Sequence, residues 1–281
     1  MPQVILAPDS AIYHALTHLI EKADRVFFAG LPGVGKSLLL QQMTLMARAA
    51  GRRATLLQWD IARQPFERPR YPLADGATHP LVIRAAGAWL RGALVEWDAR
   101  FKKPDDMLIG EVPLNGGRFM EIAKPAADDA EALLRDRRTQ FLIPVPSRRV
   151  RALIEARRER SIAQPQHENE AHDAPPDLLR ALWQDVYRVG AALGLAADTG
   201  CDAPYSPEVY AAVYRHLLQH RHRQVLPIDE QLQTSASVYQ HAEPPPVLKA
   251  TAVQAEAILA KLEASLTPEQ AIAAAETWYE V

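Results

Sequence analysis

Residues 25–37 read RVFFAGLPGVGKS. The apolar run at residues 25–29 predicts a short buried strand that leads into glycine-rich sequence. Residues 37–50 (SLLLQQMTLMARAA) predict a helix, which ends at Gly51. Residues 53–59 (RATLLQW) then predict a second buried strand. A strand, a helix and a second strand in such close succession are typical of a crossover unit, so the sequence indicates an α/β fold with a parallel sheet.

The loop at residues 30–37 fits the pattern G-x-x-x-x-G-K-S/T and lies between the predicted strand and helix, which is the context in which this pattern binds phosphate. Glycines let the backbone curl so that successive N–H groups point at phosphate oxygens, and the helix N-terminus adds partial positive charge. Lys36 is placed to reach the β- and γ-phosphates, and Ser37 is placed to ligate Mg²⁺. The residues predicted to bind the nucleotide are Gly30, Leu31, Pro32, Gly33, Val34, Gly35, Lys36, Ser37 and Leu38.

With this motif in this context, the chain resembles the P-loop NTPase superfamily, which implies a three-layer α/β/α fold. The guanine-reading sequence Asn/Thr-Lys-x-Asp of GTPases does not occur in the chain, so ATP is the expected nucleotide. AAA+ and helicase motors carry a hydrophobic run that ends in Asp-Glu, and this run is absent as well. Residues 107–111 (MLIGE) offer only a single acid after a glycine, which disfavours a remodelling motor.

Within the superfamily, the stretch from residue 25 to residue 228 looks most like the small-molecule and nucleoside kinases, such as uridine kinase, gluconate kinase and the zeta-toxin kinases. The resemblance implies that the chain uses ATP and Mg²⁺ to transfer the γ-phosphoryl group to a hydroxyl of a small metabolite. In several of these families an acid at the end of the second strand acts as a base or orients the acceptor, and Asp60 holds the matching position. Glu111, at the end of the third strand, either holds Mg²⁺ through water or takes the base role instead. A helix cap or surface acid is the alternative interpretation of both residues.

Arginines concentrate between residues 135 and 160, where nine of them accompany three acids. In the resembled kinases the helix after the fourth strand leads into a lid, and arginines of this lid close over the transferred phosphoryl group. Residues 147–177 are therefore predicted to be lid-like, with Arg157, Arg158 and Arg160 as the candidate contacts. A solvated helix with ion pairs between residues four apart is an equally good interpretation of the same arginines.

Arg118 follows a pair of glycines after the third strand, where it either meets a substrate anion and stabilises the transition state or lies in a surface turn. Trp59 is expected in the core rather than stacked on a substrate. Residues 61–79 are rich in proline and charge, which predicts a long surface loop. In related kinases this insertion and the following helix bind the acceptor, so residues 61–79 and 80–101 are expected to do so here.

The rest of the chain continues the alternation of strands and helices. Further strands are predicted at 107–110, 139–145 and 224–228, which gives about five in all. Further helices are predicted near 12–22, 80–101, 119–135, 148–160, 178–193, 207–221, 248–266 and from Thr267 onward. We therefore expect an N-terminal helix (1–24), a kinase-like domain (25–230) and a helical C-terminal extension (231–281).

Composition excludes several other classes of protein. The chain has 32 Lys and Arg residues against 34 Asp and Glu residues, so there is no global positive charge to hold nucleic acid or an anionic membrane. Cys201 is the only cysteine, which excludes an intramolecular disulfide and fits a reducing compartment. We expect its thiol to be buried and inert.

No run approaches the ~18 apolar residues of a membrane span. A cytoplasmic location is expected.

One alternative function comes from another class: an ATP-binding module that hydrolyses slowly and regulates a protein partner. An apolar stripe on the last helices would favour such a partner or a homodimer. The sequence does not identify the acceptor of a kinase reaction.

Overall fold

Five parallel strands form the centre of the molecule. The computed structural model describes residues 3–72, 78–101, 103–164, 167, 174–197, 200, 202–232 and 244–281. Within these residues the strands form one sheet in the order β2-β3-β1-β4-β5. Their bounds are β1 (Arg25–Ala29), β2 (Arg53–Leu57), β3 (Asp106–Val112), β4 (Thr139–Pro146) and β5 (Arg223–Ile228). The predicted α/β class with a five-stranded parallel sheet is confirmed.

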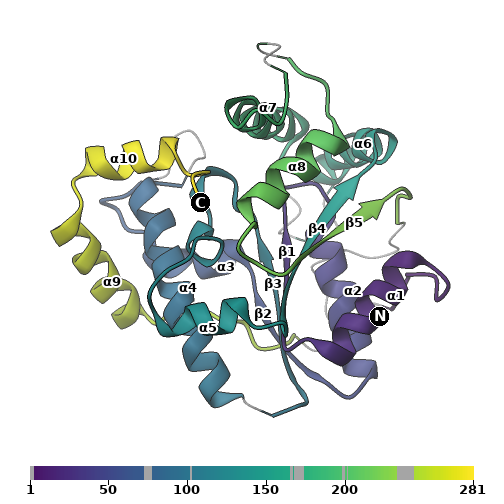
Figure 1. Ribbon diagram of the computed structural model, residues 1–281, viewed down its shortest axis with the longest axis horizontal. Coiled ribbons are helices and arrows are strands. Elements are labelled where there is room, and N and C mark those ends of the chain that lie inside the picture. Colours follow the sequence, from purple (N-terminus) through teal and green to yellow (C-terminus); the bar gives the residue numbers. More distant parts are fainter. Residues whose placement is uncertain are drawn as a thin grey trace.

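Helices cover both faces of the sheet, so the fold has three layers (Figure 1). One face packs against α1 (Ala11–Lys22) and α2 (Lys36–Ala49). The other face packs against α4 (Pro80–Arg100), α5 (Asp129–Arg135) and α8 (Pro207–Leu217). Two further helices, α6 (Arg148–Ala163) and α7 (Pro176–Ala192), lie side by side beyond the carboxyl end of β4.

The apolar run that precedes the glycine-rich loop is buried on both of its faces. Successive residues of a strand point to opposite faces of the sheet. Phe27 and Ala29 accordingly join the cluster under α4 and α8, whereas Val26 and Phe28 join the cluster under α1 and α2. This double burial explains why β1 is apolar throughout instead of alternating with polar residues.

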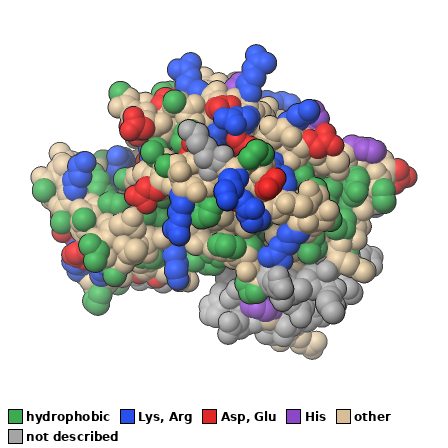
Figure 2. Space-filling view, turned by 90° about the horizontal axis from the view of Figure 1, so that it is seen from below, with side chains coloured by type: hydrophobic (Ala, Val, Ile, Leu, Met, Phe, Trp, Pro, Cys, Tyr) green, Lys and Arg blue, Asp and Glu red, His purple; other side chains and the backbone are tan. Residues whose placement is uncertain are grey.

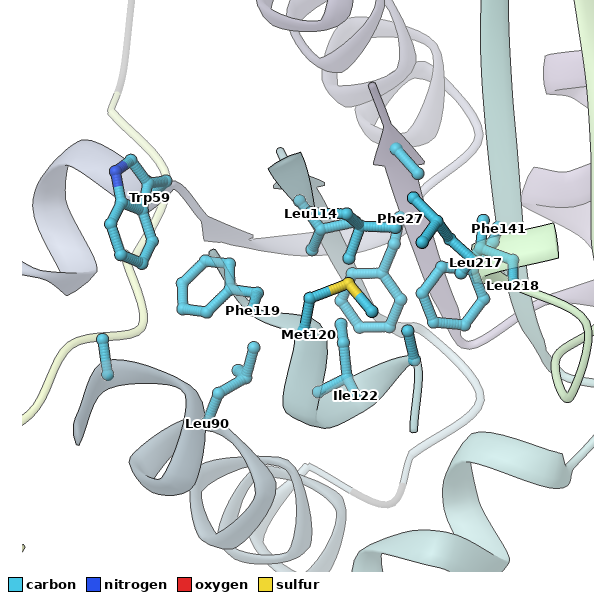
Figure 3. Close-up of a cluster of buried hydrophobic side chains, with 14 of the residues drawn as sticks. Phe27, Trp59, Leu90, Leu114, Phe119, Met120, Ile122, Phe141, Leu217 and Leu218 are labelled. Carbon is cyan, nitrogen blue, oxygen red and sulfur yellow. The ribbon is translucent and has the colours of Figure 1, made fainter. Parts of the chain in front are cut away.

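The larger core cluster contains Trp59, as the sequence predicted. Figure 3 shows Trp59 beside Phe119, with Leu90 of α4 close to them. The two rings meet edge to face with their centroids 5.0 Å apart, an arrangement favoured by aromatic quadrupoles.

The C-terminal helices share this core. Both α9 (Ala252–Ser265) and α10 (Pro268–Glu276) pack beside α4 (Figure 1), and Leu259 and Trp278 are buried in the main cluster. The chain just before α9 runs along the edge strand β2. The Leu56 N–H donates to the carbonyl oxygen of Pro246 at 2.8 Å, and the Leu248 N–H donates to that of Leu56 at 2.7 Å. The extension therefore covers one edge of the sheet.

Two predicted elements are wrong around residues 59–66. The second strand ends at Leu57, and Trp59–Ala62 forms the short helix α3. A 3₁₀ turn, η1 (Gln64–Phe66), follows it. The expected loop therefore begins with helical turns, because Phe66 is fully buried in the core and holds this segment on the body.

The single helix predicted over residues 119–135 is also wrong. The segment forms a 3₁₀ turn, η3 (Met120–Ile122), and the separate helix α5. Pro125 interrupts the helical pattern, and the Asp128 side chain caps α5 by accepting a hydrogen bond from the Glu131 N–H.

Several helix ends also differ from the prediction. Helix α8, for example, ends at Leu217 rather than at residue 221. Helix α9 begins at Ala252 rather than at residue 248, because Thr251 and Gln254 form a capping box. Helix α6 continues to Ala163, which shortens the expected loop at 161–177. Residues 165, 166 and 168–173 of that loop, residues 73–77 and Cys201 lie outside the described residues.

Charged side chains of both signs mix on the surface. On the face in Figure 2, Lys and Arg alternate with Asp and Glu rather than gathering into one basic patch. Among the residues that the structure describes, no helix is long and apolar enough to cross a membrane.

Candidate functional site

The glycine-rich loop (residues 30–37) joins the carboxyl end of β1 to the start of α2. Gly33 and Gly35 have φ angles of 75° and 90°, which favour glycine. Gly35 is the N-cap of α2 and offers no side chain to the helix. The first N–H groups of a helix lack partners within the helix, so this loop presents donors that suit an anion.

Lys36 begins α2 and lies under the loop with only 7% of its surface exposed. Its Nζ donates a hydrogen bond to the carbonyl oxygen of Leu31 at 2.8 Å. Burial lowers the pKa of Lys36 to about 8, and the negative charges of Glu111 and Asp60 oppose this shift. Because burial removes water from this ammonium group, an anion bound at the loop would stabilise its charged form.

Glu111 meets the first turn of α2 through Ser37. β3 lies directly beside β1, with Glu111 opposite Phe28 in the register. This position brings the Glu111 carboxylate to the Ser37 hydroxyl, which donates to Oε2 at 3.1 Å. Glu111 is 8% exposed, and burial raises its pKa while the Lys36 charge opposes the rise. Ser37 and Glu111 were both predicted at the site, and the fold brings them together.

The oxygens of Ser37 and Glu111 are ligands of the kind that a magnesium ion prefers. Mg²⁺ prefers oxygen ligands and is commonly held by one or two carboxylates, water and substrate phosphates. The described part of the chain holds no cluster of three or more His, Cys, Asp or Glu side chains that could bind a metal alone. A metal ion at Ser37 and Glu111 would need further oxygen ligands, of the kind that water and phosphate supply.

Two arginines of α6 act on the region of the glycine-rich loop. Arg151 is buried and donates to the carbonyl oxygens of Pro32 at 3.4 Å and Leu179 at 3.0 Å. Its Nε also pairs with Glu155, so the predicted ion pair four residues apart is present as well. The charge of Arg158 lowers the pKa values of both Lys36 and Glu111.

The other predicted lid arginines point elsewhere. Nη1 of Arg157 donates to the carbonyl oxygen of Leu232, beyond β5, at 3.5 Å. The Arg160 Nε donates to Ala156 within α6. Of these three arginines, Arg158 is the one whose charge acts on Lys36 and Glu111.

Asp60 and Arg118 form a more open rim. Asp60 is the second residue of α3 rather than the end of a strand, and its side chain is 76% exposed. It pairs with Arg63 at 3.4 Å. Arg118 is half-buried and lies over the Trp59 ring, 6.0 Å from its centroid. Burial lowers the pKa of Arg118 and the Asp60 charge opposes the shift, so the two groups interact across the rim.

The sequence did not identify the residues of α7 and α8 that pack against the glycine-rich loop. The Tyr210 hydroxyl of α8 accepts a hydrogen bond from the Leu31 N–H at 3.2 Å. A Cβ at Gly30 would overlap this hydroxyl, and a Cβ at Gly33 would press on Leu179 of α7. These partners lie more than 140 residues from the loop, and no local pattern in the sequence marks them.

No protein-family model matches the chain, and neither a curated protein nor a solved structure shows significant similarity to it.

Proposed function

We propose that the chain is a P-loop protein that binds ATP with Mg²⁺ and transfers the γ-phosphoryl group to a hydroxyl of a small metabolite. The observation that carries the proposal is the contact of Ser37 with the buried Glu111 beside Lys36. This contact places a hydroxyl and a carboxylate next to the Lys36 ammonium group. All three lie at the N-terminus of a helix, which favours the binding of an anion.

Each group has a role that follows from its position. The N–H groups at the start of α2 and the Lys36 ammonium hold the phosphates, and Ser37 with Glu111 holds the metal. Mg²⁺, when bound with ATP, disperses the charge that develops on the phosphate oxygens. Arg158 and the buried Arg151 add positive charge on the α6 side of the loop, where it opposes repulsion between phosphate groups.

The two candidate acids are suited to different tasks. Glu111 is buried and hydrogen-bonded to Ser37, which favours a role at the metal. Asp60 is exposed and pairs with Arg63 through Oδ1 alone, so its carboxylate can accept a further hydrogen bond from an acceptor hydroxyl. It is also close enough to Arg118 to influence the pKa of that residue. We assign Asp60 to orienting the acceptor and Arg118 to binding an anionic group on it.

The test is ADP formation from Mg-ATP, with and without a pooled library of hydroxylated metabolites. Wild type is compared with Lys36→Ala and Asp60→Asn, and the matched controls are Lys261→Ala and Asp177→Asn at exposed positions. We expect acceptor-stimulated turnover that both site variants lose by about 100-fold or more and both controls retain.

Other results would change the proposal. Turnover that is independent of acceptors and lost only in Lys36→Ala would favour a hydrolysing module that regulates a partner. Absence of ATP binding by the wild type would overturn the P-loop assignment itself.

A further inference from the structure

Helix α8 carries two tyrosines whose hydroxyl groups bind backbone at the carboxyl end of the sheet. Tyr210 and Tyr214 are four residues apart, so they project from the same face of the helix. Both are fully buried, and their ring centroids are 4.7 Å apart. Burial raises the pKa of each phenol, so both hydroxyl groups keep their protons at neutral pH and can donate as well as accept hydrogen bonds.

Tyr210 binds the beginning of the glycine-rich loop. Its hydroxyl oxygen accepts a hydrogen bond from the Leu31 N–H at 3.2 Å. A Cβ at Gly30 would lie 2.3 Å from this oxygen, so the hydroxyl occupies space that the glycine leaves free. The carbonyl oxygen of the same Leu31 accepts the hydrogen bond from Lys36 Nζ at 2.8 Å. A single loop residue therefore connects the Tyr210 phenol to the Lys36 ammonium group.

Tyr214 binds the chain that follows β3. Its hydroxyl donates to the carbonyl oxygen of Pro113 at 2.9 Å, and Pro113 lies two residues after Glu111. The strands β1 and β3 are neighbours in the sheet, and the 3.1 Å hydrogen bond from Ser37 to Glu111 joins the segments that follow and end them. One face of α8 thus contacts both stretches of backbone that carry the candidate site.

The hydrogen bond to Leu31 affects which conformation the loop adopts. Leu31 is fully buried, and phenylalanine at position 210 would remove the acceptor of its N–H while keeping the aromatic ring. A buried N–H without an acceptor costs free energy, so conformations that pair this N–H elsewhere would become more populated. The apparent affinity for an anion falls with the population of the binding-competent conformation.

We propose that Tyr210 and Tyr214 are positioning residues, which fix the glycine-rich loop and the end of β3 relative to each other and thereby set the geometry of the anion site. Tyr210 acts on Lys36 through Leu31, and Tyr214 acts on the backbone at the end of β3. The proposal rests on the proposed function, because it assigns both tyrosines to the binding of Mg-ATP.

The first test is Mg-ATP binding, measured by isothermal titration calorimetry. We expect Tyr210→Phe and Tyr214→Phe each to bind about tenfold more weakly than the wild type, because each loses a buried hydrogen bond that maintains the site. The matched control is Tyr187→Phe, which removes the hydroxyl of another buried tyrosine, one that donates to the carbonyl oxygen of Ala197 after α7. It should bind as the wild type does. Circular dichroism checks that all three variants fold.

The second test needs no ligand. Amide hydrogen exchange of Leu31, followed by NMR spectroscopy, reports directly on the hydrogen bond that Tyr210 accepts. We expect Tyr210→Phe to speed this exchange about tenfold more than it speeds exchange in α1, on the other face of the sheet. A general loss of stability would speed both equally. Tyr187→Phe should show no such selective change at Leu31.

The outcomes separate this proposal from the proposed function. A tyrosine variant of α8 that binds Mg-ATP as tightly as the wild type would overturn the role given to that residue, and so would an equal loss of affinity in Tyr187→Phe. Exchange at Leu31 that rises no more than exchange in α1 would overturn the role of Tyr210 whether or not ATP binds. Absence of Mg-ATP binding by the wild type would overturn the proposed function, and selective exchange at Leu31 would then still support the action of Tyr210 on the loop.

Discussion

The Lys36 ammonium group is buried beneath the loop that it is proposed to serve. Burial lowers its pKa to about 8, and the nearest acceptor is a neutral carbonyl oxygen of the loop. Phosphate oxygens would stabilise the charged form much more strongly than this carbonyl does. The protonation state of a single side chain thus becomes coupled to ligand binding.

We expect ATP affinity to fall as the pH rises through about 8, because the free protein loses the Lys36 proton there and must regain it on binding. The loss should approach about tenfold per pH unit above this pKa. Calorimetry between pH 6.5 and 9.5, in buffers of different ionisation enthalpy, measures both the affinity and the proton uptake.

The control for this prediction is Lys36→Met, which should bind ATP weakly and without proton uptake. A wild-type affinity that stays constant to pH 9.5 would contradict the role given to the Lys36 charge.

At this scale, the sequence predicted the residues of the glycine-rich loop. It also predicted two distant residues, Glu111 at the end of a strand and Arg158 on an arginine-rich helix, but it did not predict Tyr210. The loop from Gly30 to Ser37 could be recognised because one short pattern contains its glycines, lysine and serine. Tyr210 reaches the same loop only through tertiary packing, 179 residues away from its partner Leu31. No spacing rule connects residues that distant, so only the folded chain identifies them.

At the scale of elements, helix α4 contains two glycines in different surroundings. A Cβ at Gly87 would overlap the Glu121 carboxylate, whereas a Cβ at Gly92 would meet nothing within 4 Å. Both residues lie inside the helix, where alanine is intrinsically favoured over glycine by about 1 kcal/mol.

Alanine substitutions at these two positions should have opposite effects. We expect Gly87→Ala to destabilise the protein by about 1–3 kcal/mol because of the overlap, and Gly92→Ala to stabilise it by about 0.5–1 kcal/mol. Urea denaturation measures both changes. Adding Glu121→Ala to Gly87→Ala should recover part of the loss; if it recovers nothing, the overlap is not the cause.

The sequence predicted correctly the elements that have one continuous apolar pattern. It did not predict the elements whose first or last residue is set by a cap or a tertiary contact. β1 and α4 are continuous patterns, and both lie where the sequence placed them. The helix expected over residues 119–135 failed because Pro125 and the Asp128 cap divide it. Helix α3 was missed because burial of Trp59 and Phe66, rather than a periodic pattern, sets its position.

At the scale of the whole molecule, the C-terminal extension belongs to the main core. Leu259 of α9 is fully buried in the same cluster as strand and α4 residues, whereas Val253 on the same helix is 79% exposed. The arginines of residues 68–70 also pair with Glu256 and Glu263 of α9, so the helix is tied to the segment after η1.

Leu259→Ala should therefore lower the free energy of unfolding by about 2–5 kcal/mol, and Val253→Ala should change it by less than about 0.5 kcal/mol. The unfolding should remain a single transition in both variants, followed by circular dichroism and tryptophan fluorescence. A separate early transition in Leu259→Ala, with the main transition unchanged, would instead indicate that the extension folds as an independent unit.

The pairing of Leu56 with the chain around Val247 sets an order for the protein's biosynthesis. A ribosome releases β2 well before it releases the partner segment around Val247, so the strand edge stays open while the intervening residues are made. Unpaired strand edges can recruit other chains. The newly made protein is accordingly most exposed to mispairing with its neighbours on a polysome, and this exposure ends only when residues 246–248 emerge and cover the edge.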